Sequence, residues 1–132
     1  TVTNVFGSSK AYRLDVRPSP ANRVQSWLTV FEARADSVSA LAGTGGAEGC
    51  VIAGPGRPKA AVFASSDQPA LSARITFSLP RGGVATVVTD LRPGARYRLS
   101  RTPSAGRVLV ALEQAGAGAL RADSSGTLSF TS

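Results

Sequence analysis

The chain has 132 residues, of which 42% are hydrophobic, and it carries a formal net charge of +7 at pH 7. This length predicts a single domain that buries roughly two-thirds of the surface exposed by the unfolded chain. One cysteine and no histidine exclude an internal disulfide, zinc sites of the usual Cys or His type, and Ser-His or Cys-His catalysis. The sequence has no apolar run of about 18 residues and therefore predicts no transmembrane segment.

The N-terminal region is expected to hold an arm or edge strand over residues 1–10, followed by a β-domain over residues 11–132. Within residues 11–18, Tyr12, Leu14 and Val16 alternate with charged residues. A period of two is typical of a strand with one buried face.

Residues 24–34 predict a second strand, because bulky and β-branched side chains crowd together there. Trp27 lies inside this apolar run, so we expect it in the core. The alternative is that its ring is a stacking platform for a sugar. The stretch that follows, residues 36–49, is rich in glycine and is expected to be a surface loop or flexible hairpin.

Seven further strands are each bounded by Gly, Pro, Asp or Ser, and they cover 50–54, 59–65, 73–79, 84–91, 95–101, 106–114 and 126–132. Residues 79–84 and 122–127 resemble hairpin turns, with positive φ expected at Gly82, Gly83 and Gly126. About nine or ten short strands, one every 8–12 residues or so, predict an all-β protein with a single antiparallel β-sandwich.

The stretch "DLRPGARYRL", residues 90–99, predicts a structural corner. Leu91, Pro93 and Gly94 would form a rigid bend, and Tyr97 would bury its ring and return a hydrogen bond to the backbone of the bend. This arrangement resembles the tyrosine corner of immunoglobulin-like and fibronectin type III sandwiches.

Arginine accounts for thirteen of the fifteen basic residues, the others being Lys10 and Lys59. The candidate ligand-binding residues are Arg96, Arg98, Arg101 and Arg107. Alternation places the first two on the strand face opposite Tyr97, and guanidinium groups suit the carboxylates and sulfates of acidic glycans. The alternative is a solvated strand face on which arginine serves solubility. Nucleic acid is disfavoured, because lysine-rich runs are absent and only 6% of residues are aromatic.

The remaining reactive groups predict no catalytic or metal site and no cofactor. Cys50 lies in the apolar stretch "GCVIAG" and is expected to be a buried, inert thiol. The eight acidic residues are scattered along the chain and include Asp15, Glu32, Asp36, Asp67, Asp90, Glu113 and Asp123. Asp123 is expected to close an Asx turn, with a calcium ligand as the alternative.

Four pieces of the chain resemble the C-terminal β-sandwich domain of bacterial heparinase II/III-like polysaccharide lyases and related secreted glycan-processing proteins. They are Tyr12 to Pro18, Trp27 to Phe31, Leu91 to Tyr97 and Gly126 to Phe130. The resemblance implies a preceding catalytic domain as a partner. The helical domain that carries catalysis in that family has no counterpart in these residues, so no catalytic residue is transferred.

The expected function is therefore that of a non-catalytic accessory module of a polysaccharide-processing protein, with acidic polysaccharide as the ligand of its arginines. The expected location is bacterial and secreted or cell-surface, periplasmic or extracellular, which an opening Thr1 without methionine fits. The alternative is a structural subunit of a filament or surface layer. In that case the N-terminal arm would form a homo-oligomer by adding a strand to a neighbour.

Overall fold

The computed structural model describes residues 35–65, 68 and 70–132. These residues form nine strands: β1 Ser37–Thr44, β2 Ala47–Ala53, β3 Lys59–Ala64, β4 Arg74–Pro80, β5 Ala85–Val88, β6 Arg96–Ser104, β7 Arg107–Gln114, β8 Leu120–Arg121 and β9 Leu128–Thr131. The arm over 1–10, the strands expected over 11–18 and 24–34, and Trp27 all lie outside the described residues. The described part is all-β, as the turn spacing predicts.

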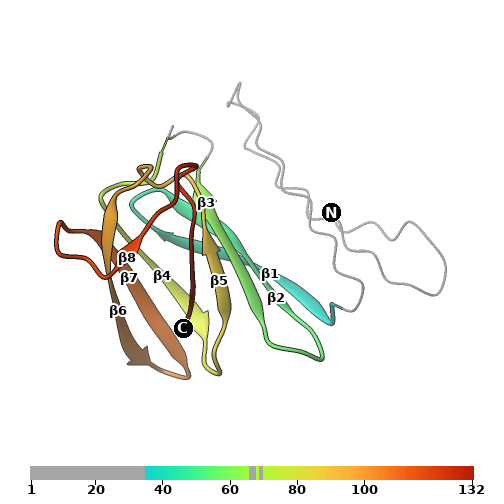
Figure 1. The fold of residues 1–132 in the computed structure, drawn as a ribbon. Helices are drawn as coiled ribbons and strands as arrows, with labels where there is room; N and C mark the ends of the chain where they lie inside the picture. Colours follow the sequence, from blue (N-terminus) through green and yellow to red (C-terminus); the bar gives the residue numbers. More distant parts are fainter. Residues whose placement is uncertain (1–34, 66–67, 69) are drawn as a thin grey trace, which may run out of the picture.

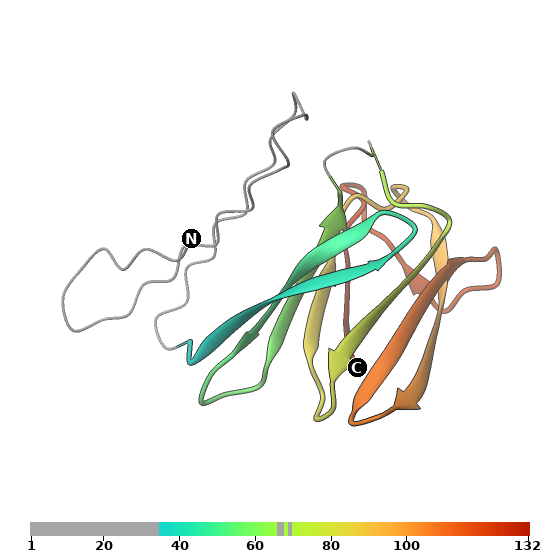
Figure 2. The ribbon, with the colours of Figure 1, turned by 180° about the vertical axis from the view of Figure 1, so that it is seen from behind.

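The nine strands form one nearly closed, barrel-like sheet in the order β8-β6-β7-β4-β1-β2-β3-β5-β9. In Figures 1 and 2, β6 and β7 lie on one side of the molecule and β1 to β3 on the other. Strand β1 joins the two halves, since Ser37–Ala42 pairs with β2 while Gly43–Thr44 pairs with β4. The pairing is antiparallel except between β3 and β5, which are parallel.

The core lies between the two halves and is built from alternate residues of each strand. Ile75, Phe77 and Leu79 of β4 are at most 2% exposed, and they face Val110 and Leu112 of β7, which are fully buried. This confirms the strand expected over residues 73–79. Each such aliphatic or aromatic side chain stabilises the fold by about 1.5–3 kcal/mol relative to exposure in water.

The hairpin expected for the glycine-rich stretch over 36–49 is present, but its loop is much shorter than expected. The hairpin is formed by β1 and β2, and only Gly45 and Gly46 form the turn. The alternation of apolar and polar side chains is present in this hairpin but weak, because small residues occupy most of its positions. Leu41 and Ala47 are nonetheless buried in the core.

The expected hairpin turns at 79–84 and 122–127 are wrong, although the positive φ at Gly82, Gly83 and Gly126 is confirmed. Neither turn joins neighbouring strands. Strand β4 pairs with β1 and β7, whereas β5 pairs with β3 and β9. Likewise, β8 pairs with β6, and β9 pairs with β5. Both turns therefore carry the chain from one half of the barrel to the other.

Within the described ranges, we find no helix with the length and apolar character needed to cross a membrane.

Candidate functional site

The turn before β6 holds Tyr97 in a corner. The Tyr97 side chain is 2% exposed, and its hydroxyl oxygen accepts a hydrogen bond from the backbone N–H of Arg92 at 3.2 Å. The N–H of Ala95 donates to the carbonyl of Arg92 at 3.1 Å, which closes a four-residue turn. Pro93 occupies its second position and Gly94, with φ of 70°, its third, as a type II turn requires.

The corner is fastened to the turn between β8 and β9. The N–H of Gly94 donates to the carbonyl of Asp123 at 3.0 Å, and the N–H of Leu91 donates to the carbonyl of Gly126 at 3.1 Å. The Arg121 Nε donates to the carbonyl of Gly94 at 3.1 Å. Two segments about 30 residues apart in the sequence therefore hold each other in place.

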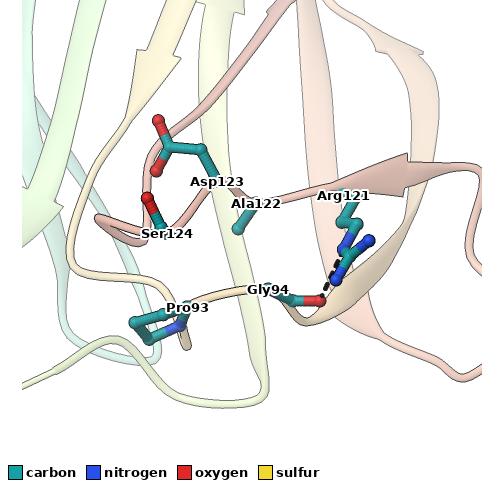
Figure 3. Close-up of a pocket in the computed structure, with 6 residues that line it drawn as sticks. All are labelled: Pro93, Gly94, Arg121, Ala122, Asp123 and Ser124. Atoms are coloured by element: carbon teal, nitrogen blue, oxygen red, sulfur yellow. Dashed lines mark hydrogen bonds between the residues drawn. The ribbon is translucent and has the colours of Figure 1, made fainter.

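A shallow hollow of about 530 Å³ lies between these two segments, and it is shown in Figure 3. Its lining residues are Pro93, Gly94, Arg121, Ala122, Asp123 and Ser124. The Asp123 carboxylate is engaged in its own turn, because its Oδ1 accepts from the N–H groups of Ser125 at 2.8 Å and Thr127 at 2.9 Å and from the Ser125 hydroxyl at 2.7 Å. The Ser125 hydroxyl bond and the backbone N–H bonds lower the pKa of Asp123. The carboxylate therefore acts as the cap of an Asx turn.

Five arginines lie on the outer face of the half formed by β8, β6, β7 and β4. We call this surface the arginine face, and its members are Arg74, Arg96, Arg98, Arg107 and Arg121. Strand register places them together: Arg96 opposite Arg121, Ser104 opposite Arg107, and Glu113 opposite both Arg98 and Arg74. All five are exposed, and Glu113 is the one acidic residue among the paired outer positions of these strands.

Three members of the arginine face are held by protein oxygens. Arg96 donates to the carbonyl of Gly118 at 3.3 Å, and Arg121 donates to Gly94 as described above. Arg107 donates to both the hydroxyl and the carbonyl of Ser78, at 2.9 and 2.8 Å. Arg74 and Arg98 make no hydrogen bond or ion pair with the residues that the structure describes.

Arg101 lies apart from the other candidate arginines. Odd-numbered residues of β6 face inward, as Tyr97 does, so Arg101 is on the side opposite Arg96 and Arg98. Its Nη2 donates to the carbonyl of Thr131 on β9 at 2.6 Å. This bond crosses the opening between the two ends of the sheet. We call this opening the seam; β6 and β8 border it on one side and β9 on the other.

The remaining reactive groups do not converge. Cys50 is fully buried, and this burial raises the pKa of its thiol. No group of three or more Cys, Asp or Glu side chains that could hold a metal ion occurs among the described residues. Asp15, Glu32 and Asp67 lie outside them.

Comparison with family models, curated protein sequences and solved structures finds no match.

Sequence reasoning missed two members of the arginine face, Arg74 and Arg121, and it missed the seam. The signal for Arg74 was present, since it alternates with the buried Ile75. Its proximity to Arg98 is not visible in the sequence, because it depends on β7 lying between β4 and β6.

Proposed function

We propose that this domain is a non-catalytic, extracellular module that binds acidic polysaccharide through its arginine face. The observation that carries the proposal is the charge of this surface: five guanidinium groups gather around a single carboxylate on one side of the sheet. Such a surface attracts polyanions, and planar guanidinium groups can bind carboxylates and sulfates with two hydrogen bonds each.

The layout of the face suits a chain ligand better than a small molecule. Arg107 lies opposite Ser104, which is about 20 Å along β6 from Arg98 at 3.3 Å per residue. Between them the outer positions are occupied mainly by hydroxyl side chains, including Thr76, Ser100 and Thr102. Hydroxyl groups both donate and accept hydrogen bonds, as sugars require.

Nucleic acid fits this surface less well than a glycan. Proteins that bind single strands stack bases on exposed aromatic rings, and the paired outer positions of β8, β6, β7 and β4 contain no aromatic residue. The exposed apolar residue there is Leu109, at 41% exposure.

Part of this proposal is that the chain is an accessory domain of the heparinase II/III-like type, with a sandwich related to the immunoglobulin fold. What supports it is the corner, because the buried Tyr97 and its bond to the Arg92 backbone have the geometry of a tyrosine corner. In this proposal the module carries no catalytic residue and acts by holding substrate near a separate catalytic domain.

The test is the binding of heparin and of a uronate polymer to the full chain, measured by calorimetry at several salt concentrations. We expect affinity that falls as salt rises, because exposed charge pairs are screened. The double variant Arg74→Ala with Arg98→Ala should lower the affinity about tenfold or more, since a hydrogen bond to a charged group contributes about 1.5–3 kcal/mol.

The control is the double variant Arg57→Ala with Arg81→Ala, which removes the same charge from two exposed arginines outside the arginine face. It should keep most of the affinity. Equal losses in both double variants would show that only net charge matters, and they would overturn the proposed site. Absence of salt-sensitive binding to either polymer would overturn the function.

A further inference from the structure

The two strands that border the seam turn towards it backbone groups that, apart from those of Tyr97, pair with no other strand of the described residues. In β6 the even-numbered residues bond to β7, as the 2.9 Å bond from the N–H of Ala115 to the carbonyl of Arg96 shows. In β9 the even-numbered residues bond to β5, as the 3.1 Å bond from Ser132 to Val84 shows. Because backbone groups alternate in direction along an antiparallel strand, the odd-numbered residues of both strands direct theirs into the seam.

One end of this seam is already filled by a short strand. Strand β8 pairs with β6 over only two positions, Arg96 with Arg121 and Tyr97 with Leu120. Gly118, two residues before β8, packs closely on the backbone of Tyr97, and the chain does not continue along β6. The edge of β6 from Leu99 onwards therefore has no partner strand among the described residues.

Beside this free edge lies a hollow of about 370 Å³. Its lining residues are Arg98, Leu99, Arg101, Ala117, Gly118, Ala119, Leu120 and Phe130. Leu99, Leu120 and Phe130 pack against the core and give the hollow an apolar floor. Its charged groups are two arginines, and no acidic residue lines it.

The bond from Arg101 to Thr131 shows that β6 and β9 do not pair directly. Paired strands lie about 4.8 Å apart and are joined by backbone groups, whereas here an arginine side chain crosses the seam to reach a backbone carbonyl. The bond is exposed to solvent, so water or a ligand can replace it at little cost. An inward-pointing charge of this kind also keeps a sheet edge from pairing at random.

We propose that the seam binds an extended peptide strand from a protein partner, with acidic side chains alternating with apolar ones. The inserted strand would run in line with β8 and use the backbone groups of Leu99 and Arg101 on one side and those of Ser129 and Thr131 on the other. Its apolar side chains would face the hollow, and its carboxylates would lie on the outer face, where they would meet Arg98. This inference goes beyond glycan binding and does not depend on it.

A peptide fits the seam better than a polysaccharide does because of the two facing rows of backbone donors and acceptors. Strand addition supplies the complementary row on each side, and alternate side-chain pockets then select the sequence. The charge selects an acidic partner, since Arg98 has no acidic neighbour in the hollow.

The probe is a blocked heptapeptide of alternating glutamate and valine, added to the ¹⁵N-labelled full chain. We expect slower amide hydrogen exchange at Leu99, Arg101, Ser129 and Thr131. The same peptide with methylated backbone nitrogens keeps its charge but lacks the N–H donors, and its methyl groups prevent close strand pairing, so it should not protect these amides. Binding of both peptides with equal affinity would overturn strand addition.

Arg98→Glu tests the charge preference. It should weaken the binding of the glutamate peptide about tenfold, because it removes one exposed attraction and adds one repulsion, each of up to about 1 kcal/mol. The Arg98→Glu variant should instead bind a peptide of alternating lysine and valine more tightly than it binds the glutamate peptide. The control Arg57→Glu makes the same charge change in the connection between β2 and β3, which does not line the hollow, and it should leave binding within about twofold.

Three other results would overturn the proposal. The first is unchanged exchange at the four amides at millimolar peptide, which would leave Arg101 as edge protection alone. The second is protection of these amides that rises with protein concentration and needs no peptide, which would assign the seam to a second copy of this chain. The third is protection by heparin as strong as by peptide. The first two results do not bear on glycan binding, so the two proposals can fail separately.

Discussion

The hydroxyl of Tyr97 accepts the backbone N–H of Arg92 at 3.2 Å, so the first inward residue of β6 is fastened to the turn that precedes it. The same turn is bonded to the loop between β8 and β9 through Gly94 and Leu91. The turn before β6 and the loop between β8 and β9 therefore form one rigid unit. This unit holds the start of the arginine face and the end of the seam that β8 fills.

Replacing Tyr97 by phenylalanine isolates the hydroxyl. Tyr97→Phe leaves the partly buried Arg92 N–H without its acceptor, and the free energy of unfolding should fall by about 1 kcal/mol. Tyr97→Leu should cost about 2 kcal/mol or more, because it also removes ring atoms from a site that is 2% exposed. Urea denaturation measures both, and equal stabilities for wild type and Tyr97→Phe would contradict the structural role of the hydrogen bond.

Two glycines of the unit should differ in their tolerance of alanine. Gly94 has φ of 70°, and a Cβ there would meet only Arg121 Nη2 at an ordinary contact of 3.7 Å, so Gly94→Ala should cost about 1–2 kcal/mol through backbone strain alone. Gly126 has φ of 79°, and a Cβ there would also overlap the carbonyl oxygen of Leu91, so its alanine variant should be the less stable of the two.

Gly116→Ala is the matched control for these substitutions, since no atom lies within 4 Å of a Cβ at that position and its φ is not positive. Its melting temperature should stay close to that of the wild type. The order Gly126, then Gly94, then Gly116 is the expected order of loss, and any other order would argue against the geometry of the corner.

Asp123 should make the fold sensitive to acid. Its pKa is lowered in the folded state by the Ser125 hydroxyl and by backbone N–H groups, so its stabilising effect is complete above the ordinary carboxyl pKa of about 3.9. As the pH falls below that value the unfolded chain takes up the proton first, and stability is lost through the folded pKa.

The measurement is the free energy of unfolding of Asp123→Asn and wild type between about pH 2 and pH 6. The variant should show a shallower loss on the acid side. Asp36→Asn, which removes an exposed carboxylate at the start of β1, is the control. Identical acid profiles for wild type and Asp123→Asn would contradict the capping role.

Cys50 should be unreactive while the fold is intact. Its side chain is fully buried, and burial disfavours the thiolate that reacts with alkylating reagents. Labelling in native buffer should be about a thousandfold or more slower than in denaturant, because opening a folded domain costs about 5 kcal/mol or more. Mass spectrometry measures the labelling. Rapid labelling in native buffer would show that β2 opens locally.

Period-two alternation determines which residues share a side of a strand, and this much is readable from the sequence. It places Ile75, Phe77 and Leu79 on the buried side of β4, and it sets Arg96 and Arg98 opposite Tyr97 on β6. The turn at Pro93 and Gly94 is equally local, because proline fixes φ and glycine accepts a positive one. Alternation is too weak to predict strands over 36–49, because small residues give little contrast between the two faces of β1.

Only the tertiary structure decides which strands are neighbours. A turn such as Pro80 to Val84 looks the same whether it joins paired strands or carries the chain to the other half of the barrel, since the choice depends on where the buried faces of distant strands meet. For the same reason the sequence predicts an arginine-rich strand but not the approach of Arg74 to Arg98 across β7. It also groups Arg101 with the surface arginines. The nearly closed sheet instead brings β6 opposite β9 and makes Arg101 the contact across the seam.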